Sequence, residues 1–513
     1  MKSTIKSRFT TAICTTALAL GAFSCQNNLL SPAPQTYLLA PQAYDTPSRV
    51  LAQVNGLYGY VKTGGFLGGR YQIYGDIRAN DFINRTSNSV TGLSVWNHTE
   101  SETSQNDVVN TWGFGYAAIN EINIFLAGLD ANTDKLAAAP FPTNYAATVL
   151  NYRGEARLLR ALCYYSLLQL YARPYLDGNG TRPGLPLRLT PETQLGNNDL
   201  ARSTVAQVYD QILLDLNYAE QNLPLTYTAS QNGVSTSTLN VTRAHRNTAI
   251  ALKTRVYLNM GRWSDVIAEA NKIVPTAAPY VASTGVANGL NASIVSVFAP
   301  PQETTESILS FPFTAQDQPG TQNQLAYYYL PSSLGGNGEY GLNTAAGGLV
   351  SNTGWLATDL RRTNFVVKIG TESFLTKYPT GTPYTDKAPV IRYAEVLLNL
   401  AEARIRNSNT IDAQGLALLN AVRNRSNSLP TPTSPPIDYT ATGLGSVSAA
   451  LDALLLERRI EFLGEGIRNI DLMRLNTTIP GKGSVGAVAP TNTVYIWPIP
   501  ATELASNGLM TRN

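Results

Sequence analysis

The sequence predicts a mainly α-helical protein in which helix pairs are followed by a long irregular region with short β elements. Several segments repeat apolar residues at spacings of three and four, which is typical of helices that bury one face. Between residues 276 and 388, Gly, Pro, Ser, Thr and Asn dominate instead. With 513 residues and 43% hydrophobic side chains, the chain is long enough for two lobes or one large helical array.

The N-terminus has the features of an export signal. A basic head of two lysines and one arginine precedes an apolar stretch that is too short to span a bilayer. The four residues that end at Cys25 resemble a bacterial lipobox, in which the cysteine is lipidated and becomes the first residue. The alternative is a plain secretory signal that is cut near Ser24. We therefore expect residues 1–24 to be removed and residues 25–47 to tether the protein to a membrane through the lipid.

Residues 48–275 are predicted to form an N-terminal helical region. Its helical segments are 48–61, 107–129, 148–172, 204–223, 242–260 and 264–274. The last two form a helix pair similar in size to a tetratricopeptide unit, although they lack the full consensus of that repeat. Cys163 lies in an apolar helical stretch, where we expect a buried and unreactive thiol.

Residues 276–513 are predicted to form the C-terminal region. The first part is irregular, with a short β-like run at 307–313 and an aromatic run at 325–330. Because long irregular stretches inside a compact protein are usually functional, we expect the ligand-binding part here. Helices are predicted to return at 389–407 and 413–427.

The segment from Leu454 to Leu475 is the most charged part of this region. Its apolar stripe consists of Leu456, Ile460, Leu463, Ile467 and Ile470. Gly464 and Gly466 would each cost roughly 1 kcal/mol inside a helix. We therefore predict a break at these glycines and a second short helix from about Ile467.

The charges of this segment could form either a structural lattice of ion pairs or a catalytic carboxylate pair. Opposite charges three residues apart are expected to pair at Arg458–Glu461, Glu465–Arg468, Arg468–Asp471 and Asp471–Arg474. Glu461 and Glu465 could also lie within the roughly 5 to 10 Å that separates the two carboxylates of a glycoside hydrolase. Nothing nearby raises the pKa of one above the other, and the arginines would keep both ionised. The structural interpretation is therefore favoured.

Residues 457–476, ERRIEFLGEGIRNIDLMRLN, resemble the signature of the SusD/RagB family of outer-membrane lipoproteins of Bacteroidetes-type bacteria. Further matches follow in family order and span most of the chain. They are GDIRANDFI at 75–83, GEARLLRALCYYSLLQLYA at 154–172, IRYAEVLLNLAEARIR at 391–406, ALLNAVRNRS at 417–426 and WPIPATELASN at 497–507. In this family the charged residues are architectural.

The resemblance implies a SusD-like helical scaffold with tetratricopeptide-like helix pairs. It further implies a non-catalytic, lipid-anchored receptor at the outer membrane, facing the cell surface. Such a receptor captures oligosaccharides, or peptides in RagB-like members, and delivers them to a SusC-like TonB-dependent transporter. No cofactor is implied.

The ligand candidates are aromatic and polar side chains in loops, because sugar rings stack on aromatic faces and sugar hydroxyls need hydrogen-bonding partners. They are Trp96, Asn97, Tyr327, Tyr328, Tyr329 and Trp355. For each aromatic ring, packing beneath a loop is the alternative. Asp76 and Arg78 could bind a ligand or brace their loop as an ion pair. Trp112, Trp263 and Trp497 are expected to lie in the core.

Composition and motifs exclude several other classes of function. Without the signal, the chain carries 35 basic and 35 acidic residues, which makes it a poor candidate for nucleic-acid binding. Neither His98 nor His245 has a partner at metal-ligand spacing. Phosphate-loop and G-x-S-x-G motifs are absent from the sequence. We expect no enzyme and no metal site, with a lipid-anchored glycoside hydrolase as the less favoured alternative.

Overall fold

The computed structural model describes residues 40–194, 196, 198–427 and 437–513. The predicted signal (1–24), the predicted lipidation site Cys25 and most of the predicted tether lie outside the described residues. Among the described helices, none is long and apolar enough to cross a membrane.

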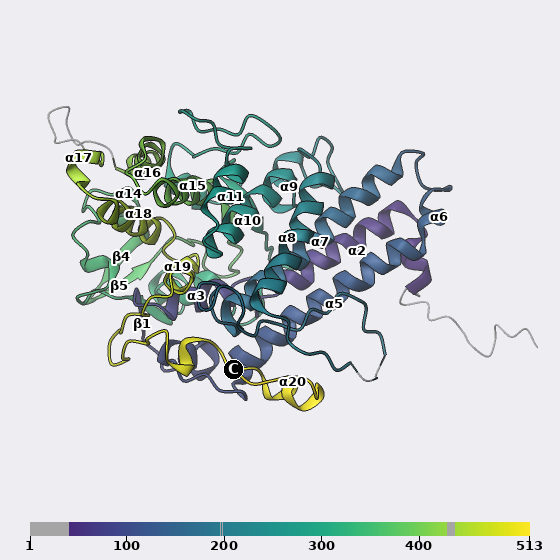
Figure 1. The fold of residues 1–513 in the computed structure, drawn as a ribbon, viewed down its shortest axis with the longest axis horizontal. Helices are drawn as coiled ribbons and strands as arrows, with labels where there is room; N and C mark the ends of the chain where they lie inside the picture. Colours follow the sequence, from purple (N-terminus) through teal and green to yellow (C-terminus); the bar gives the residue numbers. More distant parts are fainter. Residues whose placement is uncertain (1–39, 195, 197, 428–436) are drawn as a thin grey trace, which may run out of the picture.

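Long helices form the N-terminal half of the molecule. The helices α2 (Pro47–Val61), α5 (Asn110–Ala131), α7 (Tyr145–Tyr171) and α8 (Val205–Asn222) lie side by side (Figure 1). The next pair, α10 (Arg246–Asn259) and α11 (Trp263–Ala270), packs against α8 through α10. Thr204 and Gln207 form a capping box that fixes the start of α8. The predicted helix pairs are confirmed.

The C-terminal half is built around α15 (Tyr393–Ser408). This helix packs against α10 and α11 on one side and against α16 (Ala413–Ser426) and α18 (Val447–Glu461) on the other. The helix α19 (Ile467–Arg474) follows α18 and contacts α3 (Arg70–Ile77) of the N-terminal half. Helices from distant parts of the sequence thus join the two halves.

Short antiparallel strand pairs hold the irregular region in place. The pairs are β1 (Phe82–Asn84) with β3 (Tyr340–Leu342), β2 (Ser307–Phe311) with β6 (Ala388–Arg392), and β4 (Val366–Ile369) with β5 (Glu372–Leu375). The remaining short helices are α4 (Leu93–Asn97), α6 (Thr133–Leu136), α9 (Thr236–Thr242), α12 (Ile294–Phe298), α13 (Leu325–Tyr329), α14 (Leu360–Phe365), α17 (Ala441–Leu444) and α20 (Ala501–Ser506). The prediction of a mainly helical fold with short β elements is confirmed.

A hydrophobic core runs through both halves and includes residues from Tyr44 to Ile499. Trp112 and Trp497 are buried in it, as predicted, whereas Trp263 is only half-buried and packs beneath the guanidinium of Arg406. The division of the chain at residue 275 stays a prediction.

Cys163 is buried in α7 without a disulfide partner, and burial raises the pKa of its thiol. This agrees with the unreactive thiol expected from the sequence.

Candidate ligand-binding site

The charged signature segment forms a buried lattice of ion pairs rather than an open acid–base pair. The helix α18 ends at Glu461, and α19 begins at Ile467, as the two glycines predict. Gly464 and Gly466 adopt φ angles of 85° and 78°, in the left-handed region that favours glycine. This turn allows the carboxylates of α18 to face helices elsewhere in the fold.

Glu461 lies at the centre of this lattice, and its side chain is completely buried. Its carboxylate accepts hydrogen bonds from Arg425 at 2.5 Å, Arg361 at 2.8 Å and Arg392 at 2.9 Å. Burial alone would raise the pKa of Glu461, but these three guanidinium groups outweigh it and hold the pKa well below its usual range.

Glu465 is ionised for the same reason. Its burial is outweighed by Arg392 at 2.7 Å and by Lys377 at 2.6 Å, which lower the pKa of Glu465. A glycoside hydrolase needs one carboxylic acid that is protonated near neutral pH. Glu461 and Glu465 do not supply one.

The sequence predicted the wrong partners for most charges of this segment. Arg458 does not pair with Glu461 but donates two hydrogen bonds to Asp471, at 2.9 and 3.0 Å. Of the expected pairs, only Asp471–Arg474 forms, at 2.8 Å. The guanidinium of Arg468 makes no ion pair with Glu465 or Asp471 within the described part of the chain. Only the pair Glu465–Arg468 spans the left-handed turn, which breaks its helical register. The other failed pairs lie within one helix, where Arg458 and Glu461 are bound by side chains of other elements.

Trp96 is 7% exposed and lies in α4, next to the half-buried Asn97. Its indole N–H donates a hydrogen bond of 3.0 Å to the carbonyl of Phe82. The ammonium group of Lys482 lies 5.8 Å from the ring centroid, and Gly483 lies close to the ring edge. Ligand stacking on Trp96 stays a prediction.

The aromatic run in α13 divides between the core and the surface. Tyr328 and Tyr329 are completely buried, and the hydroxyl of Tyr329 donates a 2.9 Å hydrogen bond to Asp76. Asp76 also accepts a hydrogen bond of 3.1 Å from the backbone N–H of Gly466, and burial raises the pKa of Asp76 well above its usual range. These contacts brace the two halves of the molecule.

Asp76 and Arg78 do not form the bracing ion pair that the sequence suggested. Arg78 is completely buried, donates to the carbonyl of Val494, and lies 3.8 Å from a carboxylate oxygen of Glu100. The reason is that Asp76 and Arg78 lie at the end of α3, where their side chains meet different elements.

Trp355 is 2% exposed, and the guanidinium carbon of Arg362 lies 5.3 Å from its ring centroid. Arg362 also donates a hydrogen bond of 2.9 Å to the backbone carbonyl of Trp355. In this arrangement the arginine occupies the face that a sugar would need, so binding through Trp355 stays a prediction.

Tyr327 alone of the predicted aromatic candidates is half-buried at the surface. Its ring lies edge-on to the half-buried ring of Tyr384, with 6.1 Å between centroids and 78° between planes. Gln322 donates a hydrogen bond of 3.4 Å to the Tyr327 hydroxyl. The exposed Asn337 lies nearby, because its backbone N–H donates a hydrogen bond to the Tyr327 carbonyl. Arg85 donates to the carbonyl of the adjacent Gly338.

Tyr384 was missed by the sequence analysis. Its signal is an aromatic residue in the Gly/Pro/Thr-rich stretch GTPYTD, which resembles many other loop residues. Only the fold places this loop beside α13. Tyr327 and Tyr384, with Gln322 and Asn337 at their edge, are called the tyrosine platform below.

Comparison with known proteins identifies the family. Residues 337–513 match the sequence profile described as SusD family, and residues 63–258 match one described as "Starch-binding associating with outer membrane". The crystal structure of a SusD superfamily protein from Bacteroides fragilis is 32% identical, with a TM-score of 0.76, over 91% of this chain and 99% of that one. This chain belongs to the SusD family.

More distant solved structures share the fold. A SusD superfamily protein from Bacteroides thetaiotaomicron VPI-5482 is 22% identical, with a TM-score of 0.75 over 91% of this chain and 99% of that chain. Surface glycan-binding protein A from Bacteroides uniformis is 20% identical, with a TM-score of 0.67 over the same shares. None of the curated proteins compared matches the sequence.

Proposed function

We propose that this SusD-family chain is a non-catalytic receptor that captures oligosaccharides at the outer membrane and delivers them to a SusC-like TonB-dependent transporter. Family membership supports the proposal, because a matching profile is described as starch-binding and a relative of the same fold is called a glycan-binding protein. The tyrosine platform is the observation in this structure that carries it.

The chemistry of the platform suits a neutral sugar. The two phenol rings lie at a steep angle, so a sugar ring could place its C–H face on one ring and its edge against the other. The amide of Gln322 reaches the Tyr327 hydroxyl and could exchange that hydrogen bond for one with a sugar hydroxyl. The exposed Asn337, whose amide donates to Glu339, offers a further amide beside it. The buried Glu339 carboxylate beside Tyr327 already accepts hydrogen bonds from Thr86 and Thr91, so a neutral ligand suffices.

The direct test is calorimetric titration of the full-length, detergent-solubilised protein with a panel of neutral oligosaccharides. Aromatic contacts contribute about 0.5–1.5 kcal/mol each, so Tyr327→Ala and Tyr384→Ala should each weaken binding by about twofold to thirteenfold. Tyr60→Ala is the matched control, because Tyr60 is 47% exposed on α2 and lies outside the platform. If neither platform variant changes the affinity of any sugar that binds, the platform is not the site.

Two further outcomes separate the alternatives. Binding of peptides but of no oligosaccharide would favour a RagB-like peptide receptor. Release of shorter sugars during incubation with the polysaccharide panel would indicate a glycoside hydrolase. We do not expect hydrolysis, because Glu461 and Glu465 are enclosed and ionised.

Membrane attachment and the transporter partner rest on the sequence and the family. We expect Cys25→Ser to move the protein from the membrane fraction to the soluble fraction. Affinity purification of the wild-type protein should recover a TonB-dependent transporter from the native membrane, and protease treatment of intact cells should cleave a receptor that faces the cell surface.

A further inference from the structure

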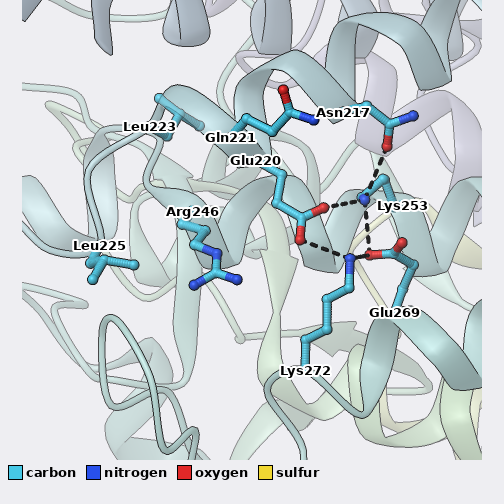
Figure 2. A pocket seen from close by; sticks show the side chains of 9 residues that line it. All are labelled: Asn217, Glu220, Gln221, Leu223, Leu225, Arg246, Lys253, Glu269 and Lys272. Atoms are coloured by element: carbon cyan, nitrogen blue, oxygen red, sulfur yellow. Dashed lines mark hydrogen bonds and ion pairs between the residues drawn. The ribbon is translucent and has the colours of Figure 1, made fainter. Parts of the chain in front are cut away.

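A wide polar hollow lies on the helical half, away from the tyrosine platform. Its volume is about 610 Å³, which is within the range of small-molecule sites. Figure 2 shows the side chains that line it. They come from α8, α10, α11 and the segments that follow α8 and α11, and they are Asn217, Glu220, Gln221, Leu223, Leu225, Arg246, Lys253, Glu269 and Lys272.

Most charges of this hollow cancel in a closed ring. Lys253 contacts both Glu220 and Glu269, the latter at 2.9 Å. Lys272 contacts the same two carboxylates, each at 2.8 Å. Each glutamate therefore has two lysine partners, and the ring is neutral as a whole. The Lys253 ammonium also donates a hydrogen bond of 3.1 Å to the amide oxygen of Asn217.

Arg246 is the unbalanced charge of the hollow. Its side chain is half-buried, and no hydrogen bond or ion pair joins its guanidinium to any described residue. In Figure 2 the interactions drawn connect the lysines, the glutamates and Asn217, whereas Arg246 stands apart from them. Arg246 is also the first residue of α10, where the helix dipole adds positive potential. An anion would be stabilised beside it.

We propose that this hollow is a second sugar-binding site, selective for a sugar unit that carries a carboxylate. The proposal rests on the proposed carbohydrate-binding function and adds a ligand class to it. The planar guanidinium of Arg246 matches a carboxylate through two parallel hydrogen bonds. The amides of Asn217 and Gln221 offer partners to the sugar hydroxyls, and Leu225, which is 51% exposed, offers an apolar surface to the C–H face.

The neutral ring gives this site its selectivity. Both glutamates are already paired with lysines, so they neither repel a carboxylate strongly nor compete for Arg246. A neutral sugar would meet the same hydroxyl partners but would leave the guanidinium without an anion. The carboxylate is therefore the group that distinguishes ligands here.

The test compares free acids with their methyl esters, which keep the sugar and remove the charge. Full-length, detergent-solubilised protein is titrated with trigalacturonate and with a glucuronate-containing tetrasaccharide, each beside its methyl-esterified form. The free acids should bind at least about tenfold more tightly than the esters, since a hydrogen bond to a charged group contributes roughly 1.5–3 kcal/mol. Arg246→Gln should remove this difference, and the affinity of the esters should stay unchanged.

Arg262→Gln is the matched control, because Arg262 is exposed on the same half, pairs with Asp265 and does not line the hollow. Equal affinity for acids and esters would overturn the inference, as would an Arg246→Gln variant with unchanged preference, or no binding of either acid. If Arg246→Gln weakens recovery of the transporter instead, the hollow is a protein-docking surface and the inference is wrong. Titrations with the neutral oligosaccharides, and the two tyrosine variants of the platform, test the proposed function separately.

Discussion

The lattice around Glu461 and the ring around Lys253 are built from the same kinds of side chains in different surroundings. In the lattice, the side chain of Glu461 is completely buried, and those of Arg361 and Arg392 are each 2% exposed. In the ring, Lys272 is 36% exposed. Enclosed charges must be balanced by protein partners because water cannot replace them. Charges at an open hollow can leave one group, Arg246, for a ligand.

The largest effect is expected from Glu461→Ala. It leaves three buried guanidinium groups without their shared carboxylate, so the free energy of unfolding should fall by about 3–5 kcal/mol, measured by urea denaturation. The control is Glu372→Ala, whose carboxylate is 47% exposed beside Arg85, and whose cost should stay below about 1 kcal/mol. Equal losses in the free energy of unfolding for the two variants would show that burial does not make the lattice more important for stability than an exposed ion pair.

Gly466→Ala should be the next most damaging change. The new Cβ would lie 2.6 Å from the Cα of Gln72, at a φ of 78° that costs other residues about 1–2 kcal/mol. Together with the clash, we expect a loss of about 2–4 kcal/mol. Gly59→Ala has open space around its Cβ on α2 and should stabilise by about 0.5–1 kcal/mol. If Gly466→Ala leaves the free energy of unfolding unchanged, the turn does not determine the arrangement of the lattice.

Acid should weaken the lattice through Asp471. The pKa of Asp471 would rise on burial, but Arg458 and Arg474 outweigh burial and lower it to about 2. A carboxyl with a lowered folded-state pKa stabilises above its unfolded pKa of about 3.9 and loses that stability as the pH falls through its folded-state pKa. From pH 4 to pH 2, unfolding should become about 2 kcal/mol easier through Asp471.

Asp471→Asn isolates this contribution. The variant should be less stable than wild type at pH 6, and the difference should shrink as the pH falls from 4 to 2. Urea denaturation at closely spaced pH values measures it. A difference that stays constant over this range would contradict the assigned pKa direction.

The smallest effects are expected in the ring, and they should differ between its two lysines. Lys253 is buried, so Lys253→Ala should cost about 1–3 kcal/mol, because it leaves Asn217 and two carboxylates short of a donor. Lys272→Ala should cost less than about 1 kcal/mol, since the Lys272 side chain is 36% exposed and its ion pairs are partly solvated. Thermal melts of the two variants measure the difference in stability. An equal loss of stability in both would show that the ring is uniformly solvated.

The sequence predicted the elements of the signature segment better than their contacts. The cost of glycine in a helix depends on local conformation, so the break at Gly464 and Gly466 could be predicted. The partners of Glu461 could not, because Arg361, Arg392 and Arg425 come from other elements that only the fold brings together. The spacing within one helix therefore predicted an arginine that is close to Glu461 in the sequence, although that arginine pairs with another acid.

The candidate site shows the same limit. Trp96 and Trp355 stand in polar loops, which suggested exposed rings, but Lys482 and Arg362 lie over them. The tyrosine platform pairs Tyr327 with Tyr384 from a separate loop. Arg246 lies in an amphipathic helix, and nothing in the sequence distinguishes it from other helical arginines. Which side chain remains uncovered depends on what packs against it.

By itself, the sequence determined the helical class, the irregular middle region, the break in the signature segment and the family resemblance. These follow from spacing, composition and local backbone cost, which act between neighbours in the chain. The tertiary structure alone decided which charges are enclosed, which rings reach the surface and which arginines lack an acidic partner. Burial and pairing are set by segments far apart in the sequence, and they fix the energies of charged and aromatic groups.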